Sequence, residues 1–97
     1  MFYLEESCPV CEDGILGFLK CSDGKTIVVM CEECCSVWLK PDEIGCEEPI
    51  YPQAPDFRLP NTDISVKGGG SEWAAYEEII DIGFGVYVSK EREYTVP

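Results

Sequence analysis

Seven of the 97 residues are cysteines, and four of them form two Cys-x-x-Cys pairs, Cys8 with Cys11 and Cys31 with Cys34. Each pair can form a tight turn that aims both sulfurs at one point, and two pairs supply the four thiolates of a tetrahedral metal site. An odd number of cysteines cannot pair completely within one chain, so we expect thiolates held by a metal rather than a disulfide framework. The spacing therefore predicts one closed four-sulfur site.

The segment between the two pairs must bring them together, and its sequence predicts a β-hairpin. Asp23 and Gly24 lie between two apolar runs, residues 15–21 and 26–30. An Asp-Gly pair in this setting is a strong hairpin signal, because a two-residue type I′ turn needs positive φ at both central positions. The cross-strand partners that follow from this turn are Cys21 with Thr26, Lys20 with Ile27, Leu19 with Val28, Phe18 with Val29, and Gly17 with Met30.

Both faces of the expected hairpin are largely apolar. A hairpin with one face in water alternates apolar and polar residues, which this one does not. We therefore expect cover on both sides, from residues 36–39 as a third strand and from a segment in the second half of the chain.

These features together resemble a zinc ribbon over residues 1–45. The resemblance rests on Cys8-Pro9-Val10-Cys11, the hairpin, Cys31-Glu32-Glu33-Cys34 and a following strand with Val37 and Trp38. In zinc ribbons the four cysteines are ligands, so the resemblance implies one structural Zn²⁺ on Cys8, Cys11, Cys31 and Cys34. Many ribbons have glycine directly after the second cysteine of a pair, where this chain has Glu12 and Cys35. Cys35 in place of Cys34 is therefore an alternative ligand.

Other interpretations of the cysteines remain open. A rubredoxin-like iron site uses the same four thiolates. A thioredoxin-like redox motif needs Cys-x-x-Cys at the start of a helix in a βαβ unit, which Pro9 and the following strand do not provide. The remaining cysteines, Cys21, Cys35 and Cys46, are expected to be small buried apolar groups.

A chain of 97 residues is long enough for one domain, so we expect residues 1–97 to fold as a single unit. Residues 1–48 form the ribbon in this interpretation. Residues 49–61 hold four prolines and are expected to be an irregular connector. Residues 62–97 are expected to form a strand, a glycine-rich loop at residues 67–71, a helix and a final strand.

The expected helix begins after Ser71 as its N-cap and ends at Gly83. Trp73, Tyr76 and Ile80 form its apolar stripe, and the final strand contains residues 86–88. The predicted fold class is α+β, with a three-stranded zinc ribbon packed against a C-terminal strand-helix-strand layer.

The chain is strongly acidic, with a net charge of −12, of which −8 falls in residues 1–48. Proteins that bind nucleic acid carry basic patches that neutralise phosphates, so we expect neither direct nucleic-acid binding nor membrane binding here. We expect instead a basic protein partner, with Trp38 or Trp73 as an apolar anchor. The partner-binding acids lie on the two metal loops and are Glu12, Asp13, Glu32 and Glu33.

Catalysis has little support in the sequence. The chain has no histidine, and four sulfur ligands leave no open position on a metal, so we expect no enzyme. The first residues lack the basic start and apolar run of a secretory signal, and no stretch matches a membrane span. We therefore expect a cytoplasmic protein.

The expected function is a small acidic zinc-binding interaction module. In a sharper version it is an inhibitor or immunity protein that covers the cationic cleft of a toxin by imitating a polyanionic substrate. One alternative is a rubredoxin-like redox carrier, which colour and a reversible one-electron potential would identify. Another is an accessory zinc ribbon of a nucleic-acid machine, which binding to nucleic acid at low salt would identify. A fourth possibility is that the charge serves solubility alone.

Overall fold

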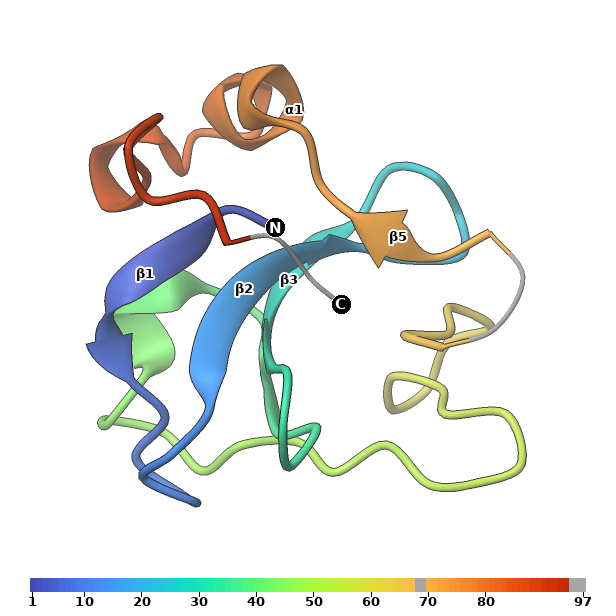
Figure 1. Cartoon of the computed structure of the whole chain (residues 1–97). Helices are drawn as coiled ribbons and strands as arrows, with labels where there is room; N and C mark the ends of the chain where they lie inside the picture. Colours follow the sequence, from blue (N-terminus) through green and yellow to red (C-terminus); the bar gives the residue numbers. More distant parts are fainter. Residues whose placement is uncertain (68–69, 95–97) are drawn as a thin grey trace.

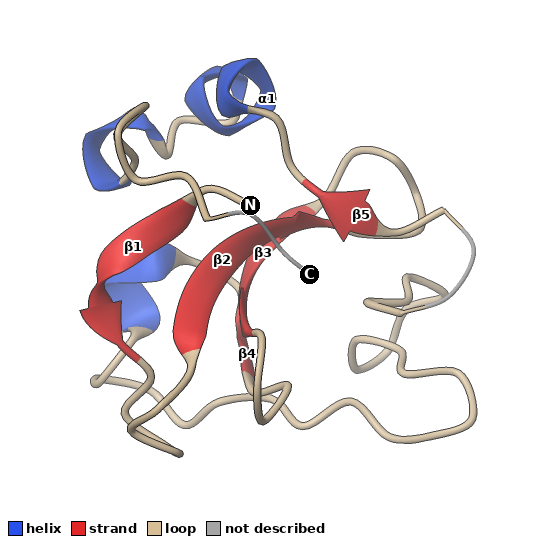
Figure 2. Cartoon of the chain, viewed as in Figure 1, coloured by secondary structure: helices blue, strands red, loops and turns tan. Residues whose placement is uncertain are grey.

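The structure is a computed structural model that describes residues 1–67 and 70–94. An antiparallel sheet forms its centre, with one short α-helix, α1 (Tyr76–Asp81), and two 3-10 helices, η1 (Pro41–Glu43) and η2 (Gly85–Tyr87), among the described residues (Figure 2). This mixture agrees with the expected α+β class. The strands found in the described residues are β1 (Tyr3–Ser7), β2 (Ile15–Lys20), β3 (Ile27–Cys31), β4 (Val37–Trp38) and β5 (Glu72–Trp73).

The central hairpin of β2 and β3 has the predicted register. Its partners include Gly17 with Met30 and Phe18 with Val29, and the N–H of Cys21 donates to the carbonyl of Thr26 at 2.8 Å. The predicted type I′ turn is wrong, because of its two central residues only Gly24 has a positive φ, 72°. The carboxylate of Asp23 holds the turn instead, accepting hydrogen bonds from the backbone of Lys25 and Thr26 and from the Thr26 hydroxyl.

The edge of β2 that faces away from β3 is shared by two strands (Figure 1). β1 pairs with its first half, with Tyr3 opposite Gly17, and β5 pairs with its second half, with Trp73 opposite Leu19. On the other side β4 pairs with β3, which confirms the expected third strand after the second cysteine pair. Two strands that lie far apart in the sequence, β1 and β5, thus share one edge of the hairpin.

The helix is shorter than predicted. It begins at Tyr76 with Ala75 as N-cap, whereas Glu72 and Trp73, expected inside the helix after Ser71, form β5. Pairing with the open edge of β2 satisfies their backbone groups and outweighs the helical pattern of the sequence. The predicted end is confirmed, because Gly83 follows the helix with a φ of 94°.

The strands predicted on either side of this helix are wrong for the described residues. Residues 62–66 form no strand, and Ser65 makes only an isolated bridge with Arg58. Residues 86–88 were expected as a strand, but residues 85–87 form η2. The outer edges of the sheet are occupied by other segments. Val37 of β4 bridges to Ile50, and Phe2, next to β1, bridges to Glu93. Residues 68 and 69 of the expected glycine-rich loop lie outside the described residues.

Two hydrophobic cores lie on opposite faces of the hairpin, which confirms that both faces are covered. The third strand, β4, extends the sheet at the edge of β3 and does not cover a face as expected. Segments 74–88 and 57–66 lie on opposite sides of the sheet in Figure 1. On one face, β2 and β3 pack against residues of α1 and its flanks, including Ile79 and Val88. On the other face they pack against Leu59 and Val66. Residues 49–61 contain no helix or strand, as expected, and they contribute to this second core. None of the helices in residues 1–67 and 70–94 is long and apolar enough to cross a bilayer.

Candidate metal centre

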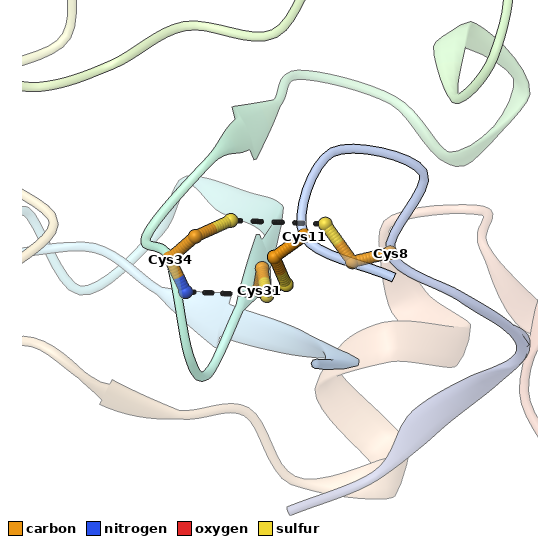
Figure 3. Close-up of side chains that lie close together, drawn as sticks. All are labelled: Cys8, Cys11, Cys31 and Cys34. Atoms are coloured by element: carbon orange, nitrogen blue, oxygen red, sulfur yellow. Dashed lines mark hydrogen bonds between the residues drawn. The ribbon is translucent and has the colours of Figure 1, made fainter. Parts of the chain in front are cut away.

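Four cysteine sulfurs converge where the loops after β1 and β3 meet (Figure 3). The Sγ atoms of Cys8, Cys11, Cys31 and Cys34 all lie within 4.8 Å of one another. Cys8 and Cys34 are 3.7 Å apart, and Cys11 and Cys31 are 3.6 Å apart. A tetrahedral ion with metal–sulfur bonds of about 2.3 Å separates its ligands by about 3.8 Å. The four residues are therefore positioned to coordinate one metal ion, and Cys34 rather than Cys35 completes the set.

The two loops that carry these cysteines have the same backbone design. We call residues 8–14 the first metal loop and residues 31–36 the second metal loop. The residue directly after the second cysteine has a left-handed φ in each, 65° at Glu12 and 62° at Cys35. Its N–H donates to the carbonyl of the first cysteine, at 3.0 Å to Cys8 and 3.2 Å to Cys31. Glycine adopts this conformation without a steric penalty, whereas Glu12 and Cys35 each carry a side chain there.

Hydrogen bonds to sulfur surround the site. Such donors favour the thiolate form and fix the orientation of metal ligands. The Cys34 sulfur lies 3.1 Å from the hydroxyl of Ser36, which is fully buried. The backbone donors are Val10 to Cys8 at 3.4 Å, Gly14 to Cys11 at 3.3 Å, and Glu33 and Cys34 to Cys31 at 3.4 Å each.

Two residues of the site were missed in the sequence analysis, Gly14 and Ser36. A Cβ on Gly14 would overlap the Sγ of Cys31 and lie 3.2 Å from the Sγ of Cys11, so no larger residue fits there. Gly14 follows Cys11 by three residues and Ser36 follows Cys34 by two, so the two positions do not repeat a common spacing that the sequence could have revealed. Gly14 contributes a backbone N–H to the site, and Ser36 contributes a hydroxyl.

The pKa values of Cys8, Cys31 and Cys34 are shifted. Burial raises the pKa of Cys8 and of Cys31. Burial also acts to raise the pKa of Cys34, but hydrogen bonds from Ser36 and from neighbouring thiols outweigh it and lower the pKa to about 7. A metal must therefore displace protons from the two most buried sulfurs when it binds.

The structure separates the remaining cysteines from the site. Cys21 is fully buried, as expected, and burial together with the charge of Asp23 raises its pKa to about 11. Cys35 is half-buried. Cys46 is exposed, so the expectation that it is a buried apolar group is wrong. It lies in the turn that follows η1, where little covers it.

The predicted partner-binding acids lie on the two metal loops. Glu12, Asp13 and Glu33 are exposed, and Glu32 is half-buried. Burial excludes one of the two expected aromatic anchors. The side chain of Trp38 is only 2% exposed and belongs to the core, so it cannot insert into a partner. Trp73 is half-buried against the second core.

No protein family, curated protein or solved structure matches this chain. The sulfur cluster and the surface around it therefore carry the argument about function.

Proposed function

We propose that this chain is a zinc-stabilised interaction module that docks a basic partner protein. The observation that carries the proposal is the closed four-sulfur cluster, whose two loops display exposed carboxylates. Four sulfurs fill a tetrahedral shell and leave no position for a substrate, so the metal has a structural role. The acids then form the surface that a partner meets.

The position of the cluster supports a structural role. Cys8 directly follows β1, and Cys31 is the last residue of β3. One ion on all four cysteines joins the loop between β1 and β2 to the loop between β3 and β4. Because sites of this kind rarely form in an unfolded chain, the free energy of metal binding is also free energy of folding.

Metal analysis tests this part of the proposal. Protein purified with zinc should contain one Zn²⁺ per chain and should unfold when a chelator removes it. Cys8→Ser, Cys11→Ser, Cys31→Ser and Cys34→Ser should each lose the ion, whereas Cys46→Ser, at an exposed position, should keep it. Protein that binds neither zinc nor iron in stoichiometric amount would contradict the proposal.

A rubredoxin-like iron site is the second candidate, and the backbone N–H groups that donate to Cys8, Cys11 and Cys31 favour it as well. Hydrogen bonds to sulfur tune the reduction potential of iron–thiolate centres. A coloured protein with a reversible one-electron potential after native purification would replace the zinc proposal with this one. Zinc alone, with no visible absorption, would reject it.

The charge of the metal loops supports docking to a basic partner. Exposed carboxylates on adjacent loops attract cationic surfaces and repel phosphate. The test is capture of proteins from a lysate by the zinc-loaded chain and by a variant with Glu12, Asp13, Glu32 and Glu33 changed to glutamine. Basic proteins should bind the native chain, elute with salt and fail to bind the variant. Identical captured sets would contradict the proposal.

The inhibitor version makes a narrower claim, that the partner is a toxin with a cationic cleft. If the captured partner acts on a polyanion, the chain should inhibit it in competition with that polyanion. Binding without any effect on such an activity would reject the inhibitor version and leave the docking module.

A further inference from the structure

A groove of about 310 Å³ lies beside the first metal loop. Pro9 and Val10 of that loop form one wall, Trp38 of β4 contributes apolar surface, and residues 45–49 form the other wall. Figure 1 shows residues 45–49 passing close to the first metal loop after leaving η1. The groove thus lies between the first metal loop and the segment that follows η1.

The walls of this groove are held in place without a ligand. The indole N–H of Trp38 donates to the carbonyl of Glu47 at 3.4 Å. The N–H groups of Cys46 and Glu47 both donate to the carbonyl of Glu43, at 3.0 and 2.8 Å. The opposite wall belongs to the first metal loop, where the N–H of Glu12 donates to the carbonyl of Cys8 at 3.0 Å. A groove formed before binding spares the ordering cost that a flexible site incurs.

The chemistry of the groove is apolar inside and acidic at the rim. Pro9, Val10, Trp38 and Pro49 line it, and the side chain of Val10 is 43% exposed. Glu47 and Glu48 lie on the same wall, both exposed, and none of the described residues that line the groove is basic. Such a site suits an aliphatic or proline side chain with lysine or arginine next to it.

We propose that this groove is the specific docking site for a short basic segment of the partner, which inserts one apolar side chain beside Val10 and pairs its cations with Glu47 and Glu48. This inference rests on the proposed function and names the surface that gives it specificity. The charge argues against a second copy of the chain as occupant, because each copy carries a net charge of −12 and would repel the other.

An unbiased peptide selection tests the inference. The zinc-loaded chain is used to select from a library of random peptides of about ten residues, which extend over about 33 Å. That length is comparable to the longest dimension of the molecule, 34 Å. Selected peptides should place lysine or arginine beside leucine, isoleucine or proline. A selected peptide should shift the NMR signals of Val10, the Trp38 indole and residues 45–48.

Matched variants separate the groove from general charge. Val10→Ser should weaken a selected peptide about tenfold, as expected for loss of a central apolar contact. Leu39→Ser should not, although Leu39 is equally exposed at 44% and lies outside the groove. Changing Glu47 and Glu48 together to glutamine should also weaken binding, whereas the same change at the exposed pair Glu5 and Glu6 should leave it unchanged.

The outcomes distinguish this inference from the proposed function. Basic peptides that bind without an apolar side chain, and that shift the NMR signals of Glu12, Asp13 and Glu33 instead, would overturn the groove as docking site. They would leave the docking function in place. Selected peptides without enriched basic residues would overturn both. A chain that dimerises in sedimentation, and loses the dimer in Val10→Ser, would assign the groove to a second copy and overturn the inference.

Discussion

Glu12 and Cys35 occupy equivalent positions of the two metal loops and share a left-handed backbone, with φ of 65° and 62°. Residues other than glycine pay a steric penalty in this region. We therefore expect Glu12→Gly and Cys35→Gly each to raise the free energy of unfolding by about 0.5–1 kcal/mol. Urea unfolding of the zinc-loaded proteins measures the change.

Zinc content provides the check on this first prediction. Cys35→Gly should keep one metal ion per chain, because Cys34 and not Cys35 lies in the sulfur cluster. Glu33→Gly is the matched control, since Glu33 lies in the second metal loop without a positive φ and should lose stability on the same change. Loss of metal in Cys35→Gly would show that Cys35 is a ligand.

Gly14 is predicted to be indispensable for metal binding. A Cβ at this position would overlap the Sγ of Cys31, so Gly14→Ala should displace that ligand and prevent stoichiometric zinc binding. Gly24→Ala is the control, because Gly24 has a positive φ of 72° but open space around its Cα. It should cost about 1 kcal/mol in stability and leave zinc content unchanged. Full zinc affinity in Gly14→Ala would mean that the loop relaxes around the added methyl.

The hairpin and the cysteine cluster could be predicted because local signals determine them. The Asp23-Gly24 turn sets the register of β2 and β3, and the two cysteine pairs then follow at the same end of the hairpin. The type of turn could not be predicted, because the Asp23 side chain provides hydrogen bonds that replace the ideal backbone geometry.

The rest of the sheet depends on contacts between residues distant in the sequence. β1 has no alternating pattern, since Leu4 is followed by Glu5 and Glu6, and it forms because β2 offers an open edge. Glu72 and Trp73 carry a helical pattern but pair with β2 for the same reason. Ser36 gave no signal of its own, because serine is common in loops and only its burial and its contact with the Cys34 sulfur show its role.

The ion pair between Lys20 and Glu78 joins the hairpin to α1, at 2.7 Å from Nζ to Oε2. The hydrogen bond from Lys20 lowers the pKa of Glu78, and the bonds to Glu78 and Glu72 raise the pKa of Lys20. Because the pKa of Glu78 is lower in the folded protein, its charge stabilises the fold above the unfolded pKa of about 4.3. This stability is lost as the pH falls through the folded pKa. Because the pKa of Lys20 is higher in the folded protein, its charge stabilises the fold below the unfolded pKa of about 10.4. This stability is lost as the pH rises through the folded pKa.

Glu78→Gln should therefore lower the melting temperature at pH 7, and its difference from the native protein should shrink toward acid pH. Comparing the two proteins at each pH cancels the acid loss of zinc, which affects both. Glu77→Gln is the control, because Glu77 lies exposed on the same helix. A difference between native protein and Glu78→Gln that stays constant down to pH 3 would mean that the charge of Glu78 does not contribute.

A fragment of residues 1–48 should not fold independently, even with zinc. Each face of the hairpin is covered by residues beyond this fragment, Ile79 and Val88 on one side and Leu59 and Val66 on the other. Without them the fragment exposes both apolar faces and should aggregate or bind a hydrophobic dye. The full chain should melt in one transition. A soluble, zinc-loaded fragment with dispersed NMR signals would show that residues 1–48 and the remainder are two independent units.

If the chain docks a basic partner as proposed, the acids of the metal loops should control how fast that partner associates. Long-range attraction acts on the encounter, and salt screens it over about 8–10 Å, so the on-rate should fall steeply as salt is added. Changing Glu12, Asp13, Glu32 and Glu33 to lysine should lower the on-rate at low salt and leave zinc content unchanged. The control reverses four exposed acids elsewhere, Glu77, Asp81, Glu91 and Glu93, with the same change in net charge. Stopped-flow association across a salt series measures both proteins against the captured partner. If the two variants slow association equally, the effect comes from net charge alone, and the metal loops have no special part in docking.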